Sequence, residues 1–440
     1  MGHLHFRRRL LLAPRLWLRR VAFWIGAVAI SLVAIAFAKA ANVANDAFHV
    51  LIHPRPAMAL LVTPLGLGLA LWMTRRFFPG SEGSGIPQAI AALEMTEAAS
   101  RQAVLSLRIA AGKILLTLLA LCSGASVGRE GPTAQIGSSI MHAVGQSLRL
   151  SHREVQRALI LAGGAAGVAA AFNTPLAGVV FAIEELSRSF EERTSGTVFS
   201  AVILAGIASL AILGNYHYFG HTAASLSLGR GWVAVFVCGG IGGLAGGVFS
   251  QSLILAARHG LPGPLGRLKA GRPVAFAVGC GLVLAVIGLL TGSATYGTGY
   301  DEAQTLLHGA SLPDGFALAK IAATIVSYLS GIPGGIFAPS LAAGAGIGAD
   351  VAKLLPMVPA GAVILLGMVA YFAGVVQAPI TAVVIVLEMT DNNEMTIPLM
   401  ASALVAFGAS RLLCPEPFYK ALAQNFLGKV EGKSAAASPQ

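Results

Sequence analysis

Charge, aromatic side chains and cysteine are all scarce in this chain. Only 11% of its 440 residues are charged and 7% are aromatic, whereas 55% are hydrophobic and 53 are glycine. So few charges exclude an ordinary water-soluble globular protein. The four cysteines are scattered through apolar segments without metal-ligand spacing, which predicts buried small side chains and neither a disulfide nor a metal site. They are Cys122, Cys238, Cys280 and Cys414.

Long apolar runs recur along the chain, and each is long enough to cross a bilayer as a helix. They cover 21–41, 57–73, 104–122, 195–213, 230–256, 273–291 and 394–413. Shorter apolar pieces are interrupted by Gly, Pro or Asn and suit half-spanning or tilted helices packed inside protein. These lie near 131–145, 157–172, 175–186, 359–375 and 378–389. The sequence therefore predicts an all-α polytopic protein embedded in a lipid bilayer.

The net charge of +11 is concentrated at membrane boundaries, so it does not indicate nucleic-acid binding. Six arginines precede the first apolar run within residues 1–20, and Arg75 and Arg76 follow the second run, whereas the loop 42–56 carries only Arg55. This asymmetry predicts a cytoplasmic N-terminus by the positive-inside rule. The first apolar run is long and lacks a convincing cleavage site, which argues against a secretory signal.

Three pairs of segments match in the same order along the chain, which indicates an internal repeat. The pairs are 83–85 with 297–299, 128–132 with 335–339, and 167–184 with the stretch that ends at Glu388. We expect a basic segment at 1–20, a first transmembrane repeat at 21–213, a connecting segment at 214–229, a second repeat at 230–413, and a C-terminal helix and tail at 414–440. The tail ends in KSAAASPQ, a composition typical of disorder.

Three of the repeated motifs are Gly-rich kinks that lead into a helix with Pro in its first turn. The sequences are GSGIP at 83–87, GREGP at 128–132 and GGIFAP at 334–339. Unpaired N–H groups at such helix starts carry partial positive charge and bind anions. Partial charges suit a permeation path because the ion must also leave. Broken helices that converge near the membrane midplane are the arrangement expected of repeat-built ion transporters.

Carboxylates distinguish the two repeats. Glu130 stands inside one amide-rich helix start, where the other repeat has Phe337. A carboxylate there can occupy the place of a permeating anion, and protonation would release it. Glu184 has a repeat partner in Glu388 and is predicted to be structural, whereas Glu185 has no acidic counterpart and is a candidate proton acceptor near the inner boundary. Lys113 is predicted either to be a buried cation that favours anions or to reach an interface.

Together these phrases closely resemble the CLC family of chloride channels and proton-coupled chloride transporters, from GSGIP at 83 to PFYKAL at 417–422. The resemblance implies the CLC fold, in which two inverted repeats of broken, tilted helices form a homodimer with one ion path per subunit. It implies a secondary active transporter that exchanges chloride for protons, and no cofactor, metal or enzymatic activity. It also implies a multi-pass protein of the bacterial inner membrane, without the C-terminal nucleotide-binding module of many eukaryotic members.

The resemblance also assigns residues to roles. It implies an anion site formed by Ser84, Tyr419 and the amides of Ile336 and Phe337. Glu130 matches the gating and external proton glutamate, and Glu185 matches the internal proton glutamate. Ser84, where some members have Pro, favours chloride over nitrate. The remaining backbone of the anion path would come from Gly83, Gly85, Gly128, Arg129, Gly131 and Gly335.

Two departures and two alternatives accompany this assignment. Gln88 and Ile90 stand where acids are common in bacterial members, which affects the predicted internal proton route. Within the family, a passive chloride channel is the alternative, although Glu185 favours the antiporter. From another class, an intramembrane serine hydrolase matches the GxSxG pattern centred on Ser126, but nothing in the sequence pairs His142 or another base with this serine.

Overall fold

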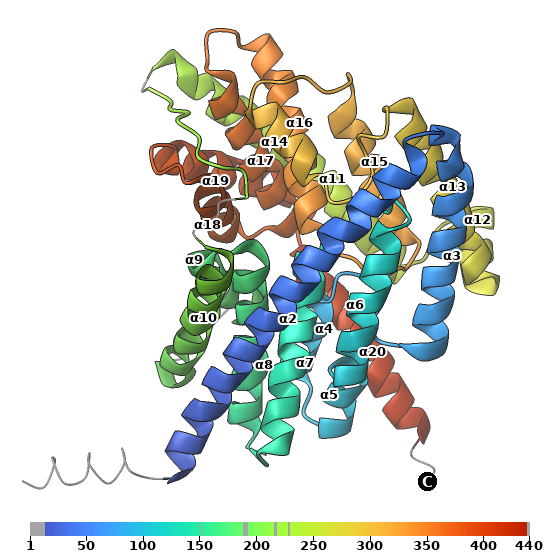
Figure 1. The fold of residues 1–440 in the computed structure, drawn as a ribbon, viewed down its shortest axis with the longest axis vertical. Coiled ribbons are helices and arrows are strands. Elements are labelled where there is room, and N and C mark those ends of the chain that lie inside the picture. Colours follow the sequence, from blue (N-terminus) through green and yellow to red (C-terminus); the bar gives the residue numbers. More distant parts are fainter. Residues whose placement is uncertain (1–13, 151, 188–191, 215–217, 228, 438–440) are drawn as a thin grey trace, which may run out of the picture.

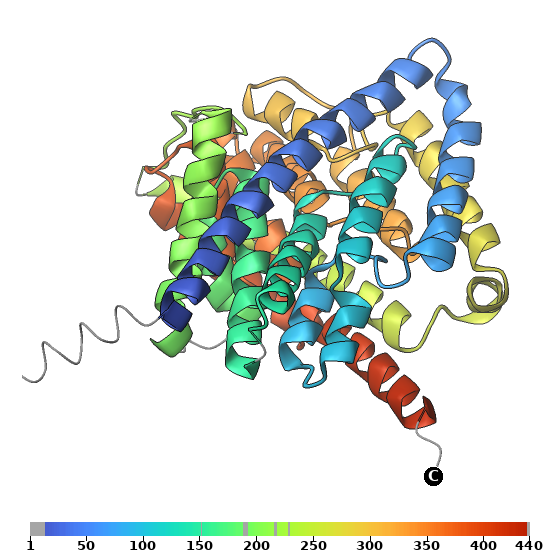
Figure 2. The ribbon, with the colours of Figure 1, turned by 60° about the horizontal axis from the view of Figure 1, so that its bottom comes forward.

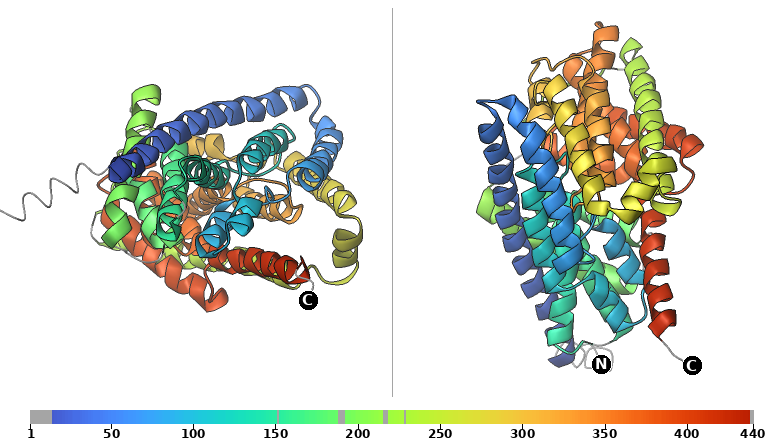
Figure 3. Two further views of the ribbon diagram at one scale, coloured as in Figure 1. Left: turned by 90° about the horizontal axis from the view of Figure 1, so that it is seen from below. Right: turned by 90° about the vertical axis from the view of Figure 1, so that its right-hand side faces the viewer.

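The computed structural model describes residues 14–437 apart from 151, 188–191, 215–217 and 228. The described residues form helices joined by short loops, with two isolated backbone bridges and no β-strand. Seven helices are long and apolar enough to cross a membrane. The predicted all-α polytopic fold is therefore confirmed. Helix α2 (Pro14–Ile52) crosses the molecule obliquely (Figures 1 and 2) and begins at the same end at which α20 (Phe418–Ala437) finishes (Figure 3).

The first repeat continues from α2 through a series of long and short helices. In order they are η1 (Pro56–Met58), α3 (Ala59–Phe77), α4 (Ile86–Glu94), α5 (Ala98–Val104), α6 (Leu107–Leu121), α7 (Glu130–Ser147), α8 (Arg153–Phe172), α9 (Pro175–Phe181), the π-helix η2 (Ala182–Ser187) and α10 (Glu192–Leu213).

The second repeat has a similar order of elements, but its described residues lack separate counterparts of α5 and η2, and the longer helix α12 stands where the first repeat has η1. Its helices are η3 (Arg230–Trp232), α11 (Val233–Arg258), α12 (Gly263–Gly271), α13 (Pro273–Leu290), α14 (Tyr300–Leu307), α15 (Phe316–Leu329), α16 (Phe337–Leu354), α17 (Ala360–Val376), α18 (Pro379–Thr390) and α19 (Thr396–Leu413). By order and sequence spacing, α4 corresponds to α14, α7 to α16 and α8 to α17.

Two reciprocal contacts show that the repeats are inverted. Gly128 and Gly335, which are repeat equivalents, exchange two backbone N–H···O bonds of 2.7 Å in an antiparallel bridge. Equivalent residues can exchange bonds in this way only across a local two-fold axis, and that axis reverses one segment relative to the other. Glu184 and Glu388 repeat the symmetry, because each carboxylate accepts backbone N–H bonds from the start of the helix that leads to the other.

Close contacts between glycines set the packing around the centre. A Cβ atom on Gly137 of α7 would lie 2.1 Å from the carbonyl oxygen of Gly163 in α8, and one on Gly344 of α16 would lie 2.7 Å from that of Gly367 in α17. Both crossings therefore need glycine, as is common where membrane helices approach closely. These contacts hold α7 and α16, the two helices that begin at the centre, against the deeply buried α8 and α17.

Several helix boundaries differ from the sequence predictions. Helix α8 begins at Arg153 and is a full 20-residue candidate span rather than a short piece. Helix α15 has only 14 residues and was not among the predicted runs. The predicted disorder of the tail is wrong for 433–437, because α20 continues through Ala437; its Lys and Ala residues are good helix formers. Residues 438–440 lie outside the described part. Three of the four free cysteines are buried, and Cys122 is half-buried.

Candidate anion-binding site

Three helix starts meet at the centre of the bundle. Gly83 donates to the carbonyl oxygen of Ile332 and accepts from the amide of Gly334, so the loop before α4 lies against the loop before α16. A Cβ atom on Gly131, the second residue of α7, would lie 2.3 Å from Ser84 Oγ. Glycine is therefore required where α7 approaches α4, and the predicted motifs form one cluster.

Free backbone donors line this cluster. The first bond within the α7 start runs from Thr133 N to Arg129 O at 2.9 Å, and in α16 it runs from Ser340 N to Ile336 O at 3.0 Å. The N–H groups of the two residues before each proline are thus left without an intrahelical partner. The α4 start is shaped by Gly85, whose φ of 103° is a left-handed conformation that favours glycine. Such starts attract negative charge.

Two hydroxyl groups face this region. Ser84 precedes α4 and Tyr419 is the second residue of α20; both side chains are buried. The two hydroxyls interact, yet neither has a hydrogen-bond partner of normal geometry among the described residues. A buried hydroxyl without a partner is uncommon and is expected where a ligand supplies the missing acceptor. The geometry suits a small anion between Ser84 and Tyr419.

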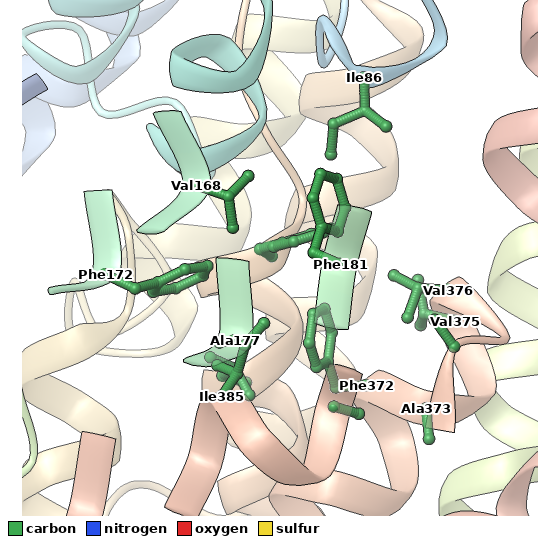
Figure 4. Close-up of a cluster of buried hydrophobic side chains, with 14 of the residues drawn as sticks. Ile86, Val168, Phe172, Ala177, Phe181, Phe372, Ala373, Val375, Val376 and Ile385 are labelled. Atoms are coloured by element: carbon green, nitrogen blue, oxygen red, sulfur yellow. The ribbon is translucent and has the colours of Figure 1, made fainter. Parts of the chain in front are cut away.

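Aromatic rings enclose the α16 side of the cluster. Phe337 packs with ring centroids 4.8 Å from Phe372, 5.9 Å from Tyr419 and 6.0 Å from Phe172. Figure 4 shows the surrounding group of buried side chains, in which Phe181 lies between Ile86 and Phe372, and Phe172 lies to the left. The rings exclude water around the amide of Phe337, which strengthens its electrostatic attraction for an anion.

Glu130 is completely buried at the first position of α7. Its Oε1 accepts a 2.6 Å hydrogen bond from the phenol of Tyr300 and lies 3.8 Å from Nε of Arg129. Its Oε2 lies beside Gly128, because a Cβ atom on that glycine would be 2.4 Å away. This oxygen has no hydrogen-bond partner among the described residues. The carboxylate thus lies beside Gly128 at the start of its own helix.

The sequence analysis missed the aromatic and cationic groups around Glu130. Tyr300 directly follows Gly299 and is the first residue of α14. Its position in the repeat pattern could therefore have identified it as a residue of the site. Tyr218 comes from the connecting segment, and its ring lies 4.9 Å from that of Tyr300. The Arg129 guanidinium lies 5.2 Å from the Tyr218 ring centroid and donates to Asn42 and to the carbonyl of Ala38 in α2.

The two adjacent glutamates at the end of the first repeat have different surroundings. Glu184 accepts bonds from Ile380 N, Thr381 N and Thr381 Oγ1 at 3.1, 2.6 and 2.7 Å, and so caps α18. Glu185 lies in the π-helix η2 with only 1% of its surface exposed. Both predicted proton carriers, Glu130 and Glu185, are therefore buried inside the protein.

Lys113 is buried and does not reach an interface. Its ammonium group donates to the carbonyls of Ser81, Glu82 and Gly83, at 2.8, 3.4 and 2.7 Å. Lys320, its counterpart in α15, donates to the equivalent carbonyls of residues 295–297 at 3.0 to 3.2 Å. In each repeat, one buried lysine thus donates hydrogen bonds to the backbone carbonyls of the loop before a Gly-rich helix start. Lys320 was not among the residues predicted from the sequence.

The other side chains singled out in the sequence are hydrogen-bonded to other residues or buried in the core. Gln88 donates to the carbonyl of Glu82, and Ile90 belongs to the hydrophobic core. Ser126 Oγ bonds to the hydroxyl of Thr324, and the ring nitrogens of His142 bond to Gln156 and Gln146. Neither group of the GxSxG alternative is therefore bonded to a catalytic partner. No group of three or more metal-ligating side chains occurs among the described residues.

Two cavities near the cluster share Pro79 and Glu82 in their linings. One has a volume of about 410 Å³ and is also lined by Arg75 and Lys269; the other has about 560 Å³ and is also lined by Arg108. The lining of the first cavity has an excess of positive charge and attracts anions toward the loop before Ser84, whereas Glu82 and Glu97 outnumber Arg108 in the second. The fold and the cluster together define a class, a multi-pass membrane protein for anion transport built from inverted repeats.

Comparison with known proteins identifies the family. The family described as voltage gated chloride channel matches residues 66–411, and the chain belongs to it. The chain is similar to a slow cyanobacterial Cl−/H+ antiporter, with 27% identity, a TM-score of 0.80, and coverage of 95% of this chain and 99% of that one. The predicted family and fold are thus confirmed.

Two further solved structures share the fold. A CLC-type fluoride/proton antiporter matches with 23% identity and a TM-score of 0.76, covering 92% of this chain and 98% of that one. A eukaryotic CLC transporter matches with 21% identity and a TM-score of 0.73, covering 93% of this chain and 74% of that one.

Proposed function

We propose that the protein exchanges chloride for protons across the membrane as a secondary active transporter. The observation that carries the proposal is the burial of two carboxylates, Glu130 with 0% and Glu185 with 1% of its surface exposed. A passive pore has no need of a second buried acid, and ionisable groups inside a membrane protein mark proton routes. The similar cyanobacterial protein is described as a Cl−/H+ antiporter.

In this proposal, the hydroxyls of Ser84 and Tyr419 and the amides of Ile336 and Phe337 hold the anion. Glycines 83, 85, 128, 131 and 335 and the backbone of Arg129 let the chain approach the ion closely. Ionised Glu130 occupies the outer part of the same electropositive cluster and blocks it. When a proton binds its carboxylate, the charge that holds the side chain there is lost, and the side chain gives way to chloride.

Glu185 would exchange protons with the cytoplasm, which completes a proton route that shares only part of the anion path. The basic segment at 1–20 and the inner-membrane location remain predictions, as does the cytoplasmic N-terminus. We also propose a homodimer. All the candidate residues come from one chain, so each subunit would contain its own path.

Flux measurements on reconstituted liposomes test the proposal. An imposed chloride gradient should drive protons uphill through the unmodified protein. Glu130→Ala should still carry chloride, because it removes the blocking carboxylate, but should move no protons. Glu130→Gln should also lose proton movement. Chloride flux without any uphill proton movement in the unmodified protein would identify a passive channel, and proton pumping that survives Glu130→Ala would refute the gating role.

A further inference from the structure

The phenol of Tyr300 is the only side chain among the described residues that donates a hydrogen bond to Glu130. The bond is short, at 2.6 Å, and both partners are buried. Hydrogen bonds to an ionised acceptor are roughly twice as strong as those between neutral groups. The bond therefore holds the Glu130 side chain in the position that it has in this structure.

The Tyr300 ring is fixed on several sides and cannot follow the carboxylate. The ring centroids of Tyr218 and Phe219 lie 4.9 and 5.8 Å from it. The Arg129 guanidinium lies 5.8 Å from its centroid, and α2 holds that guanidinium in place. Phe219 is itself held in place, because its N–H donates to the carbonyl of Met389 at 3.0 Å. A Glu130 side chain that leaves the cluster must therefore break the bond.

The other repeat shows that the fold does not require this hydroxyl. The repeat equivalents of Tyr300 and Glu130 are Ile86 and Phe337, and both belong to the buried apolar core. All four are the first residues of central helices. The equivalent positions Ile86 and Phe337 are buried and apolar, so the Tyr300–Glu130 hydrogen bond has no counterpart at these two positions.

We propose that Tyr300 is a latch that holds Glu130 closed and thereby limits the rate of transport. This inference rests on the proposed function, since it gives Glu130 the gating role. The bond exists only while Glu130 blocks the cluster, so its strength adds to the barrier for opening. Tyr300 is a positioning residue and does not itself carry the proton.

Tyr300→Phe removes the hydroxyl and keeps the ring, so the packing of Tyr218 and Arg129 is retained. Loss of a charged hydrogen bond should raise chloride turnover by roughly tenfold or more. Chloride and proton fluxes should rise together, with their ratio unchanged.

Tyr296→Phe is the matched control. Tyr296 is also buried and lies in the same loop region, but its hydroxyl donates to the carbonyl of Ala285 at 3.0 Å. This variant should keep the transport rate of the unmodified protein. If Tyr296→Phe raises the rate as much as Tyr300→Phe does, the effect comes from general loosening of the packing and the latch is refuted.

Measurements in the Glu130→Ala variant test the latch separately from the proposed function. In Glu130→Ala the acceptor is gone, so adding Tyr300→Phe should leave chloride flux unchanged. An equal acceleration in both backgrounds would overturn the latch, as would an unaltered rate in the single variant. If Glu130→Ala still pumps protons, the proposed function fails independently of the result at Tyr300.

Discussion

Neighbouring glutamates 184 and 185 should respond oppositely to the same substitution. Glu184 accepts three hydrogen bonds at the start of α18. Glutamine keeps one acceptor oxygen but loses the second oxygen and the charge that favours a helix N-terminus. Loss of a helix cap costs about 1 kcal/mol, and a hydrogen bond to a charged acceptor adds about 1.5 kcal/mol or more. We therefore expect Glu184→Gln to lower the free energy of unfolding by about 2 kcal/mol.

Glu185→Gln should instead retain the stability of the protein and abolish its proton transport. Its side chain is 1% exposed, and replacing a buried carboxylate by a neutral amide removes a desolvation cost. Stability should be unchanged or higher, while proton flux falls to background and chloride flux persists. Denaturation of purified protein in detergent micelles measures the first property, and paired chloride and proton fluxes in liposomes measure the second.

Glu388→Gln provides an internal standard for the cap. Glu388 is the repeat partner of Glu184 and accepts two backbone N–H bonds at the start of α9, at 3.1 and 2.7 Å. It should destabilise the protein somewhat less than Glu184→Gln and leave the coupling ratio intact. If Glu184→Gln abolishes proton flux and Glu185→Gln does not, the internal proton carrier has been assigned to the wrong glutamate. If neither variant affects proton flux, protons enter elsewhere.

Three further variants test other parts of the site. Ser84→Pro should raise nitrate transport relative to chloride in a competition flux assay, because it deletes a hydroxyl donor but keeps the surrounding amides; an unaltered preference would remove Ser84 from the anion site. Gly131→Ala should lower chloride flux at least tenfold, since its Cβ atom would come within 2.3 Å of Ser84 Oγ, and normal transport would contradict the close approach. Lys320→Met should destabilise the protein by about 3 kcal/mol or more, measured by denaturation in micelles, because three buried carbonyls lose their donor; stability like that of the unmodified protein would refute this role.

Local motifs revealed the centre of the site but not its surroundings. Glu130 could be found because its helix start recurs in the second repeat with Phe337 at the same position. The contacts of Tyr300 and Tyr218 with this gate span sequence separations of 170 and about 90 residues, and no local pattern encodes such distances. Tyr218 also lies in the segment for which the sequence predicted no role beyond connecting the two repeats.

Helix lengths were less predictable than helix starts. In water-soluble proteins, an amphipathic pattern marks which face is buried, but lipid and protein interior are equally apolar for a membrane helix. The composition therefore could not indicate that α15 ends after 14 residues or that α8 is a full span. The position of Lys113 in α6 could have predicted the role of Lys320, which lies at the corresponding place in α15. Lys320 was overlooked because its loop, 295–297, shares only Gly297 with the loop at 81–83.

The bridge between Gly128 and Gly335 restricts how the protein can alternate its access. Two bonds join these glycines, and two more join Gly83 to the segment 332–334. A rocking motion of one repeat against the other would have to open these four bonds in a dry interior, at about 1 to 3 kcal/mol for each group left unpaired. These bonds therefore join the two repeats at the place where a rocking motion would require them to slide past each other. Under the proposed function, access therefore changes through the Glu130 side chain while these four bonds stay closed.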